Sequence, residues 1–354
     1  MDIAHARQLA SACGMVASGE PTRICGLWAG MGNIFEVHCS GGKSFIVKQV
    51  LCGSDLTSVG DLRKQLSYQC EANFYNNGVA QQLLDAGCHV PRPLYILRSE
   101  NNVTICMSKL LGSPKSVDVA ESRAVLSMMA ILHASFFGEE RANAAVSRGL
   151  QQQGTYWYLD TRHDEHEAMP KHGWEGRLRL AARALDLRLK NDRNCSIVHG
   201  DLKSANILFS GDASHCSGSS GEECIPCVYD FQYCGKGCIG KDLAYFLTCG
   251  SDVDVAAEGD LLRFYQAELG RQLKLLHRAS EESCPSLREL ETILHLSFAD
   301  LGRWMSGWGW WGKSREDEII AVLDRLDGGT MLSSEAEYVA AVEREFPVKN
   351  DSWN

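Results

Sequence analysis

Residues 199–206 read His199-Gly200-Asp201-Leu202-Lys203-Ser204-Ala205-Asn206, and residues 228–232 read Val228-Tyr229-Asp230-Phe231-Gln232. Short apolar runs flank both segments, so the pattern places two carboxylates and one amide at the ends of predicted strands. Phosphoryl transfer needs a carboxylate near the attacking hydroxyl, oxygen ligands for magnesium and a cation on the nucleotide phosphates. In this interpretation Asp201 orients or accepts the hydroxyl proton. Asn206 and Asp230 hold Mg²⁺, which prefers oxygen ligands.

The same segments resemble the aminoglycoside phosphotransferase and choline kinase superfamily, including its ecdysteroid-kinase-like branch, whose catalytic loop has the form H-G-D-x-x-x-x-N. The spacing from Asp201 to Asn206 matches, and Asp230-Phe231-Gln232 fits an aspartate followed by an aromatic residue and Glu or Gln. The resemblance implies an α+β, two-lobed protein-kinase-like fold. Its small lobe has an antiparallel sheet plus a helix, and its large lobe is mostly helical. We expect residues 1–108 to form the nucleotide-binding lobe and residues 109–354 the catalytic and substrate-binding lobe.

Further matches to the family occur in the order that this fold requires. Lys48 closes a predicted strand, as the family's nucleotide-phosphate lysine does, and Glu71 resembles the helix glutamate that pairs with that lysine. Leu132-His133-Ala134 resembles the end of the first large-lobe helix, and residues 241–247 resemble the segment that opens a helix after the metal-binding aspartate. His199 has no chemical role in this mechanism, so we expect a buried, hydrogen-bonded residue that shapes the loop. We expect the carboxylate of Asp242 to organise the local backbone and not to act in catalysis.

Two other parts of the nucleotide site are less specific in sequence. Gly30 and Gly32 resemble a phosphate-covering loop, because missing side chains let backbone N–H groups approach phosphates, but a plain hairpin turn explains them nearly as well. In the connector between lobes, Met107 and Lys109 lie where the family often has acidic residues. Because backbone groups usually make the adenine contact there, this difference in side chains does not remove nucleotide binding. ATP with Mg²⁺ is the expected cofactor, and the use of GTP stays open.

Two alternative functions are weighed against a small-molecule kinase. Lys203 coincides with the lysine that helps neutralise the transferred phosphoryl group in protein kinases. However, Gly200 replaces their usual arginine, Gln232 replaces their glycine, and only eleven residues separate Asp230 from Asp242, which leaves no room for a peptide-docking segment. A nucleotide-binding module without catalysis is disfavoured because Lys48, Asp201, Asn206 and Asp230 are all present.

The acceptor is expected to be a small hydroxylated molecule such as an amino alcohol, sugar, steroid or aminoglycoside. Aromatic residues occur at 156–158 and at Trp304, Trp308 and 310–311, and such rings can hold a sugar or steroid face or a quaternary ammonium. Asp300, Arg303, Trp304 and Trp308 are therefore candidate substrate contacts. Core packing is the alternative for the tryptophans, and Asp300 and Arg303 could instead pair with each other.

Composition limits the remaining partners. The 354 residues exceed the usual size of one core, and 45 acidic against 35 basic side chains give a net charge of −10, which disfavours nucleic acid. No apolar run is long enough for a membrane span, and no obligatory protein partner is evident. The 15 cysteines lack paired spacing, so we expect reduced thiols in a cytoplasmic protein. Cys224 and Cys227 have metal-ligand spacing without a second pair, so free thiols are preferred.

Apolar periodicity predicts the elements. Strands are expected at 24–28, 34–39, 45–50, 103–107, 197–199, 207–209 and 228–231. Helices are expected within 61–86, 117–137, 173–190, 260–276 and 286–304, and the Ser/Gly/Cys-rich segment 211–223 is expected to be a flexible hairpin tip.

Overall fold

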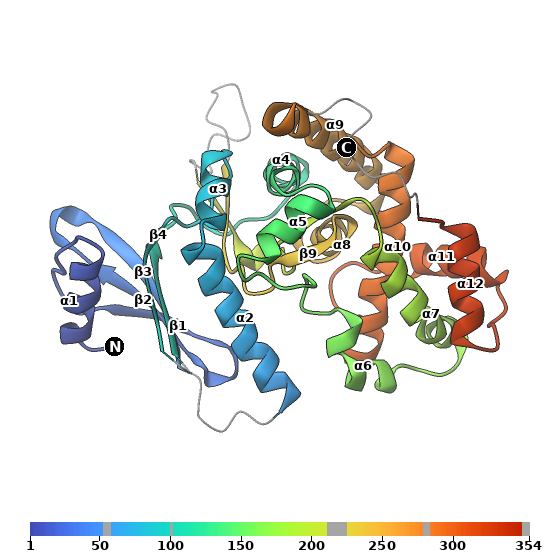
Figure 1. Cartoon of the computed structure of the whole chain (residues 1–354), viewed down its shortest axis with the longest axis horizontal. Coiled ribbons are helices and arrows are strands. Elements are labelled where there is room, and N and C mark those ends of the chain that lie inside the picture. The colour runs from blue at the N-terminus through green and yellow to red at the C-terminus, as the bar shows by residue number, and fades with distance from the viewer. Residues whose placement is uncertain (52–57, 100–101, 211–224, 279–283, 349–354) are drawn as a thin grey trace.

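A computed structural model describes residues 1–51, 58–99, 102–210, 225–278 and 284–348 of the chain. It shows a small N-terminal lobe built on a sheet and a larger, mostly helical lobe (Figure 1). The predicted α+β, two-lobed kinase-like fold is therefore confirmed.

The small lobe contains a five-stranded antiparallel sheet in the order β1-β2-β3-β5-β4. Its strands are β1 (Thr22–Gly26), β2 (Gly32–His38), β3 (Ser44–Leu51), β4 (Pro93–Arg98) and β5 (Asn102–Ser108). The helices α1 (Ile3–Ala12) and α2 (Val59–Asn76) lie on opposite sides of this sheet, and α3 (Val79–Asp85) follows α2 (Figure 1).

The alternation of side chains along β3 decides which residues reach the space between the lobes. Phe45 and Val47 are fully buried against α1, in a core that includes Ala6 and Leu9. Because successive side chains of a strand point to opposite faces, Lys48 lies on the other face, toward α2. The sequence of β3 thus directs one lysine inward from a strand whose remaining buried residues are apolar.

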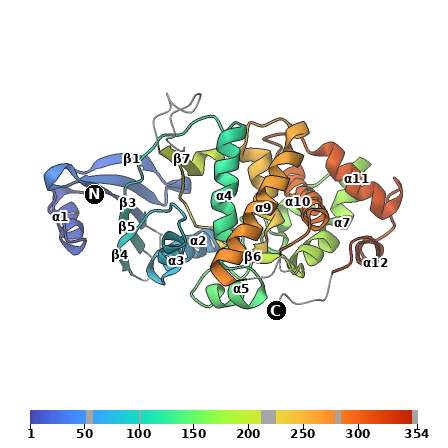
Figure 2. The same cartoon turned by 90° about the horizontal axis from the view of Figure 1, so that it is seen from above.

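The large lobe is formed by nine α-helices and two small antiparallel sheets within the described residues. The helices are α4 (Val119–Ser135), α5 (Glu139–Val146), α6 (His163–Ala168), α7 (Gly173–Lys190), α8 (Gly240–Tyr245), α9 (Glu258–His277), α10 (Leu287–Trp308), α11 (Glu316–Asp327) and α12 (Glu335–Glu345). The sheets pair β6 (Cys195–Val198) with β9 (Gly235–Cys238), and β7 (Ile207–Ser210) with β8 (Ile225–Val228). Figure 2 shows α4 and α9 packed side by side.

The loop between β6 and β7 is fixed by one buried carboxylate. Asp242, on α8, accepts hydrogen bonds from the backbone N–H groups of His199 at 2.6 Å and Gly200 at 2.9 Å, and its Oδ2 lies 3.3 Å from His133 Nε2. Gly200 has φ +81°, and a Cβ there would lie 2.4 Å from the Tyr233 carbonyl oxygen, so only glycine fits. The expectation that Asp242 organises backbone is confirmed.

Most predicted elements are present, with small shifts at their ends. The helix predicted at 173–190 is α7, and the region 61–86 divides into α2 and α3 at Gly78, whose φ is +80°. Two strands, β4 and β9, were not predicted, and the strand expected at 228–231 ends at Val228. The segment 211–223 lies outside the described residues. None of the described helices is both long and apolar enough to cross a bilayer.

Replacing Asp242 by Asn should lower the free energy of unfolding by about 2–3 kcal/mol, because an amide N–H₂ would face buried donors that the carboxylate now satisfies. Burial alone would raise the pKa of Asp242, but hydrogen bonds from His133 and Gly200 and the nearby histidines hold it below its usual value. The stability it provides is therefore present at neutral pH and lost as the pH falls through that lowered pKa. Urea unfolding followed by tryptophan fluorescence measures the change.

The matched control is Asp254→Asn, because Asp254 is exposed. An Asp242→Asn protein with the same unfolding midpoint as this control would show that the carboxylate does not hold the loop.

Candidate active site

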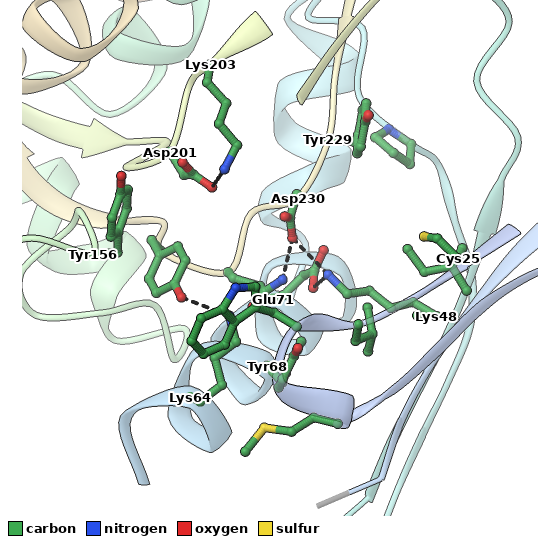
Figure 3. Close-up of a pocket in the computed structure, with 18 of the residues that line it drawn as sticks. Cys25, Lys48, Lys64, Tyr68, Glu71, Tyr156, Asp201, Lys203, Tyr229 and Asp230 are labelled. Atoms are coloured by element: carbon green, nitrogen blue, oxygen red, sulfur yellow. Dashed lines mark hydrogen bonds and ion pairs between the residues drawn. The ribbon is translucent and has the colours of Figure 1, made fainter. Parts of the chain in front are cut away.

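A cavity of about 990 Å³ lies between the two lobes and collects most of the predicted site residues. Lys48 and Glu71 come from the small lobe, while Asp201, Lys203 and Asp230 come from the large lobe, and all five line the cavity (Figure 3). The structure thus brings together side chains that are up to 182 positions apart in the sequence.

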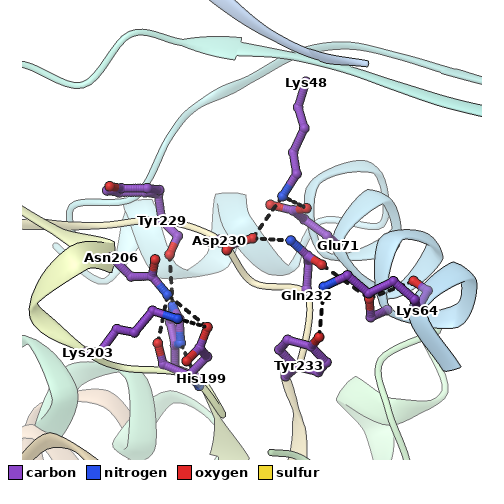
Figure 4. A network of polar contacts seen from close by, with 12 residues as sticks. Lys48, Lys64, Glu71, His199, Lys203, Asn206, Tyr229, Asp230, Gln232 and Tyr233 are labelled. Carbon is purple, nitrogen blue, oxygen red and sulfur yellow. Dashed lines mark hydrogen bonds and ion pairs between the residues drawn. The ribbon is translucent and has the colours of Figure 1, made fainter. Parts of the chain in front are cut away.

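Lys48 is held between two carboxylates, one from each side of the cavity (Figure 4). Its Nζ lies 2.6 Å from Glu71 Oε2 on α2 and 2.8 Å from Asp230 Oδ1. Burial alone would lower the pKa of Lys48, but the charges of Asp230 and Glu71 and their hydrogen bonds raise it above its usual value. The lysine therefore stays charged although only 4% of its surface is exposed. The predicted pairing of Lys48 with Glu71 is present.

Asp230 stands in an uncommon backbone conformation. Its φ is +70°, which is rare for a residue with a side chain and typical of functional loops. Gln232 Nε2 donates to Asp230 Oδ1 at 2.6 Å, and the neighbouring Phe231 stacks on Phe74 of α2 at 3.9 Å between ring centroids. Burial would raise the pKa of Asp230, but Lys48 and the hydrogen bond from Gln232 lower it to about 2, so the carboxylate is ionised.

Asp201 has one engaged and one unengaged carboxylate oxygen. Its Oδ2 accepts from Lys203 Nζ at 3.0 Å and from Asn206 Nδ2 at 3.2 Å, whereas Oδ1 is buried without a hydrogen-bond partner among the described residues. Burial raises the pKa of Asp201, against the charge of Lys203. His199 supports this loop, because its Nδ1 accepts from the Asp201 N–H at 3.2 Å and its Nε2 lies 3.1 Å from the Tyr229 carbonyl. The expected structural role of His199 is confirmed.

The donor set for the predicted metal fits a hard divalent cation. Asn206 Nδ2 is directed to the Asp201 carbonyl and carboxylate, at 2.8 and 3.2 Å, which leaves its amide oxygen as the donor atom for a metal. Asp230 supplies an ionised carboxylate, whose Oδ1 accepts from Lys48 and Gln232, and no hydrogen bond to its Oδ2 comes from the described residues. Oxygen donors of this type suit Mg²⁺. No cluster of three or more His, Cys, Asp or Glu side chains with metal-ligand geometry occurs among the described residues.

Gly30 lies in the turn between β1 and β2, with φ +71°, and Gly32 is the first residue of β2, with φ +135°. A Cβ on Gly32 would lie 2.0 Å from the Gln49 carbonyl oxygen, so this glycine permits close strand packing. Trp28 and Met31, in the same turn, line the cavity, whereas the two glycines are not among its lining residues. This geometry favours the hairpin-turn alternative for both glycines.

The connector residues lie where they were predicted. Met107, at the end of β5, and Lys109, just beyond it, both line the cavity. Lys109 Nζ lies 2.8 Å from Glu36 Oε1 on β2, so its ammonium is engaged by the small lobe.

Aromatic residues of the large lobe form one wall of the cavity. Trp304, Trp308 and Trp311 line it together with Tyr156, whose ring meets Trp304 edge to face at 4.7 Å. Trp157 is fully buried behind them. Two of the four predicted substrate residues, Trp304 and Trp308, are therefore in position to contact a ligand.

The other two predicted substrate residues are not in the cavity wall. Asp300 and Arg303 are fully buried and form an ion pair at 2.9 Å. Lys241 adds a second cation 3.1 Å from Asp300, and Arg303 also donates to the Trp157 carbonyl at 2.8 Å. The alternative, that these two residues pair with each other, is the one the structure shows.

Several lining residues were missed from sequence. Lys64 lies two helical turns before Glu71 on the same face of α2, so helical spacing could have identified it. Arg162 follows a short 3₁₀ turn at Leu159–Thr161, where no periodic pattern exists to indicate its direction. Tyr229 and Tyr233 flank the Asp230 segment and were not singled out.

The described cysteines are free thiols. Of the candidate pair at 224 and 227, Cys227 is a free thiol, and Cys224 lies outside the described residues, as does the segment 211–223.

Comparison with known proteins provides further evidence on the family. The profile of the ecdysteroid kinase-like family matches residues 178–278, which include the loop of Asp201, Asn206 and Asp230. No curated protein sequence matches the chain.

Among solved structures, a spectinomycin phosphotransferase in complex with ADP and spectinomycin is similar with a TM-score of 0.52 and 11% identity, covering 94% of this chain and 97% of that one. An amicoumacin kinase in complex with AMP-PNP and Ca²⁺ gives a TM-score of 0.48 at 12% identity, covering 98% and 95%. A Plasmodium vivax ethanolamine kinase gives 0.43 at 12% identity, covering 90% and 83%.

At these identities the structural likeness establishes the fold. The family match over residues 178–278 agrees with the resemblance to the ecdysteroid kinase-like branch that the loop sequence suggested.

Proposed function

We propose that this protein is a kinase that transfers the γ-phosphoryl group of ATP to a hydroxyl of a small molecule. The bond between the γ-phosphorus and the β,γ-bridging oxygen breaks, a bond forms from phosphorus to the acceptor oxygen, and ADP leaves. The observation that carries the proposal is that Asp201 lines the same cavity as the Lys48–Asp230 pair and that its Oδ1 has no hydrogen-bond partner among the described residues. The family match over this loop supports it.

The nucleotide end of the cavity would be formed by both lobes. Apolar side chains of Ile24, Ile46 and Leu208 line it beside the connector at Met107, which gives an adenine ring a flat apolar site next to backbone groups. Lys48 is charged and held in place by Glu71, so its ammonium is oriented toward Asp230, where the phosphates and their metal would lie. Asn206 and Asp230 would hold Mg²⁺, which when bound neutralises phosphate charge.

The acceptor end depends on Asp201 and Lys203. An acceptor hydroxyl that donates to Asp201 Oδ1 has its oxygen oriented for in-line attack, and the carboxylate takes the proton as the new bond forms. Lys203, 3.0 Å from Oδ2, would stabilise charge on the transferred group. Because burial raises the pKa of Asp201, the carboxylate is a stronger base than an exposed aspartate.

The acceptor class follows from the wall of the cavity. Tyr156, Trp304, Trp308 and Trp311 present aromatic surface beside Asp201, which suits a small molecule with an apolar face. Structures with this fold include enzymes named for spectinomycin and ethanolamine, so the fold accommodates diverse small hydroxylated compounds.

The first test is Asp201→Asn. This variant should lower kcat for magnesium-dependent ATP consumption with a hydroxylated acceptor by about 10²–10⁴-fold, because the amide cannot accept the hydroxyl proton, while ATP binding is retained. A panel of small alcohols assayed for ADP release, with Asp254→Asn as the matched control, measures it. ATP binding without turnover of any acceptor by the unaltered protein would favour the non-catalytic nucleotide-binding module.

Asp230→Asn tests the metal site. Magnesium should strengthen ATP binding to the unaltered protein. In the variant, the factor by which magnesium strengthens ATP binding should be at least about tenfold smaller, because one anionic ligand is removed. Calorimetric titration with ATP, in magnesium and in a chelator, separates the two contributions. An equal magnesium effect in both proteins would remove Asp230 from the metal site.

The pH dependence of kcat/KM provides a third test. Activity should fall as the pH drops through the raised pKa of Asp201, because protonation fills the oxygen that accepts the acceptor proton. The acid limb should therefore lie above the ordinary aspartate value of about 3.9. Asp230, with a pKa of about 2, remains ionised over this range. An acid limb at or below the ordinary value, in protein shown by fluorescence to be folded, would argue against Asp201 as the base.

A further inference from the structure

Three cationic side chains lie in the wall of the cavity, and one of them contacts the aromatic rings of Tyr156 and Trp304. They are Arg63 and Lys64 on α2, and Arg162 just before α6, and all three line the same cavity as Asp201. Building on the proposed kinase activity, we propose that the acceptor carries an oxyanion, of the carboxylate type, next to an apolar face and its reactive hydroxyl, and that this cavity selects against cationic acceptors.

Arg162 occupies the aromatic wall that could otherwise attract a cation. Its guanidinium carbon lies 5.3 Å from the ring centre of Trp304, 5.7 Å from that of Tyr156 and 5.9 Å from that of Trp308. The side chain is 6% exposed and is fixed by a 2.8 Å hydrogen bond from Nε to the Tyr156 carbonyl. An ammonium ligand would find these rings already engaged by a positive charge and would be repelled by it.

Lys64 is a second cation without an anionic partner. Its Nζ lies 3.0 Å from the Tyr233 hydroxyl, and 5.4 to 5.7 Å from the ring centres of Trp28, Tyr68 and Tyr233. Within the described residues it makes no ion pair with a carboxylate. Figure 3 shows Lys64 and Asp201 around the same space. The aromatic cage orients the ammonium without a carboxylate at ion-pair distance among the described residues, and the charge of Lys64 acts on Glu71 of the same helix, where it opposes the rise in pKa that burial causes.

Arg63 is the third cationic side chain in the cavity wall. Its guanidinium donates to the Thr161 carbonyl, and no described carboxylate forms an ion pair with it. Burial, followed by the charge of Arg162, lowers the pKa of Arg63, and the charge of Glu165 partly opposes this. An anionic group on a ligand would stabilise the charged form of Arg63 further.

The carboxylates of this region are already engaged. Glu165 pairs with Arg162 at 2.7 Å, and Asp201 with Lys203 at 3.0 Å. Asp61, in the first turn of α2, accepts from the hydroxyl of the N-cap residue Ser58 at 2.6 Å. The indole N–H of Trp304 is a buried donor without a partner among the described residues. Among the described residues, Lys64 and Arg63 therefore remain without a carboxylate at ion-pair distance, and with the Trp304 N–H they offer a chemistry that complements oxygen-rich anions.

The test uses three probes of one shape and different charge: 4-(hydroxymethyl)benzoate, 4-(hydroxymethyl)benzamide and 4-(hydroxymethyl)benzylamine. Each has one primary hydroxyl and one flat apolar face. Dissociation constants are measured by ligand-observed NMR on the full chain saturated with magnesium and a non-hydrolysable ATP analogue. We expect the benzoate to bind about tenfold more tightly than the benzylamine, with the benzamide between them.

Lys64→Met keeps the length and the aromatic packing of the side chain but removes its charge. The ratio between benzoate and benzylamine should fall at least about threefold in this variant, while affinity for the nucleotide analogue stays within about twofold. Lys171→Met, at an exposed lysine outside the cavity, is the matched control and should leave the ratio unchanged.

The outcomes separate this inference from the proposed kinase activity. If the nucleotide analogue does not bind, the proposed function fails first. If it binds, but the benzylamine binds as tightly as the benzoate or neither probe binds, the inference about the acceptor is wrong and the kinase activity stands. A Lys64→Met variant that loses nucleotide affinity instead of probe selectivity would assign Lys64 to the phosphates and also overturn the inference.

Discussion

One buried ammonium links the two lobes of this protein. Lys48 Nζ lies within 2.8 Å of two carboxylates, Glu71 on α2 and Asp230 on the segment after β8. A buried charge is stable only where it is paired, so the position of Lys48 requires that α2, β3 and the Asp230 segment come together at one point. The positive φ of Asp230 and the stacking of Phe231 on Phe74 belong to the same junction. A kinase mechanism needs this cluster, and the fold is arranged around it.

In the large lobe a second buried carboxylate, that of Asp242, also holds separate segments together. Asp242 accepts from two successive backbone N–H groups, those of His199 and Gly200, and lies beside His133 of α4. Because the loop between β6 and β7 is held at its beginning, Asp201 can present one oxygen to Lys203 and Asn206 and keep the other unpartnered. Rigid support of this kind lets a loop carry chemistry without its own regular structure.

The sequence was informative wherever a local pattern had one physical solution. Helix α7 was predicted with its observed ends because its amphipathic pattern is long, and the order Lys48, Glu71, Asp201, Asn206, Asp230 could be assigned because spacing and residue type agree with a known loop. Strand β4 was missed because Pro93 reads as a breaker, although proline is tolerated as the first residue of an edge strand. The predicted strand at 228–231 stops early because Asp230 leaves the extended conformation.

Acceptor residues were the hardest to predict, because tertiary packing alone decides which side of α10 faces the cavity. Asp300 and Arg303 have the spacing of a surface pair yet are fully buried, whereas Trp304, the next residue, reaches the cavity wall. Arg162 lies in an irregular segment, where sequence spacing gives no direction.

Phosphoryl transfer can be followed directly by ³¹P NMR of magnesium ATP incubated with the protein and a mixture of small hydroxylated compounds. The proposed kinase activity produces a phosphate monoester resonance that grows together with those of ADP. A spectrum in which ATP persists unchanged, or in which only inorganic phosphate accumulates beside ADP, would contradict it.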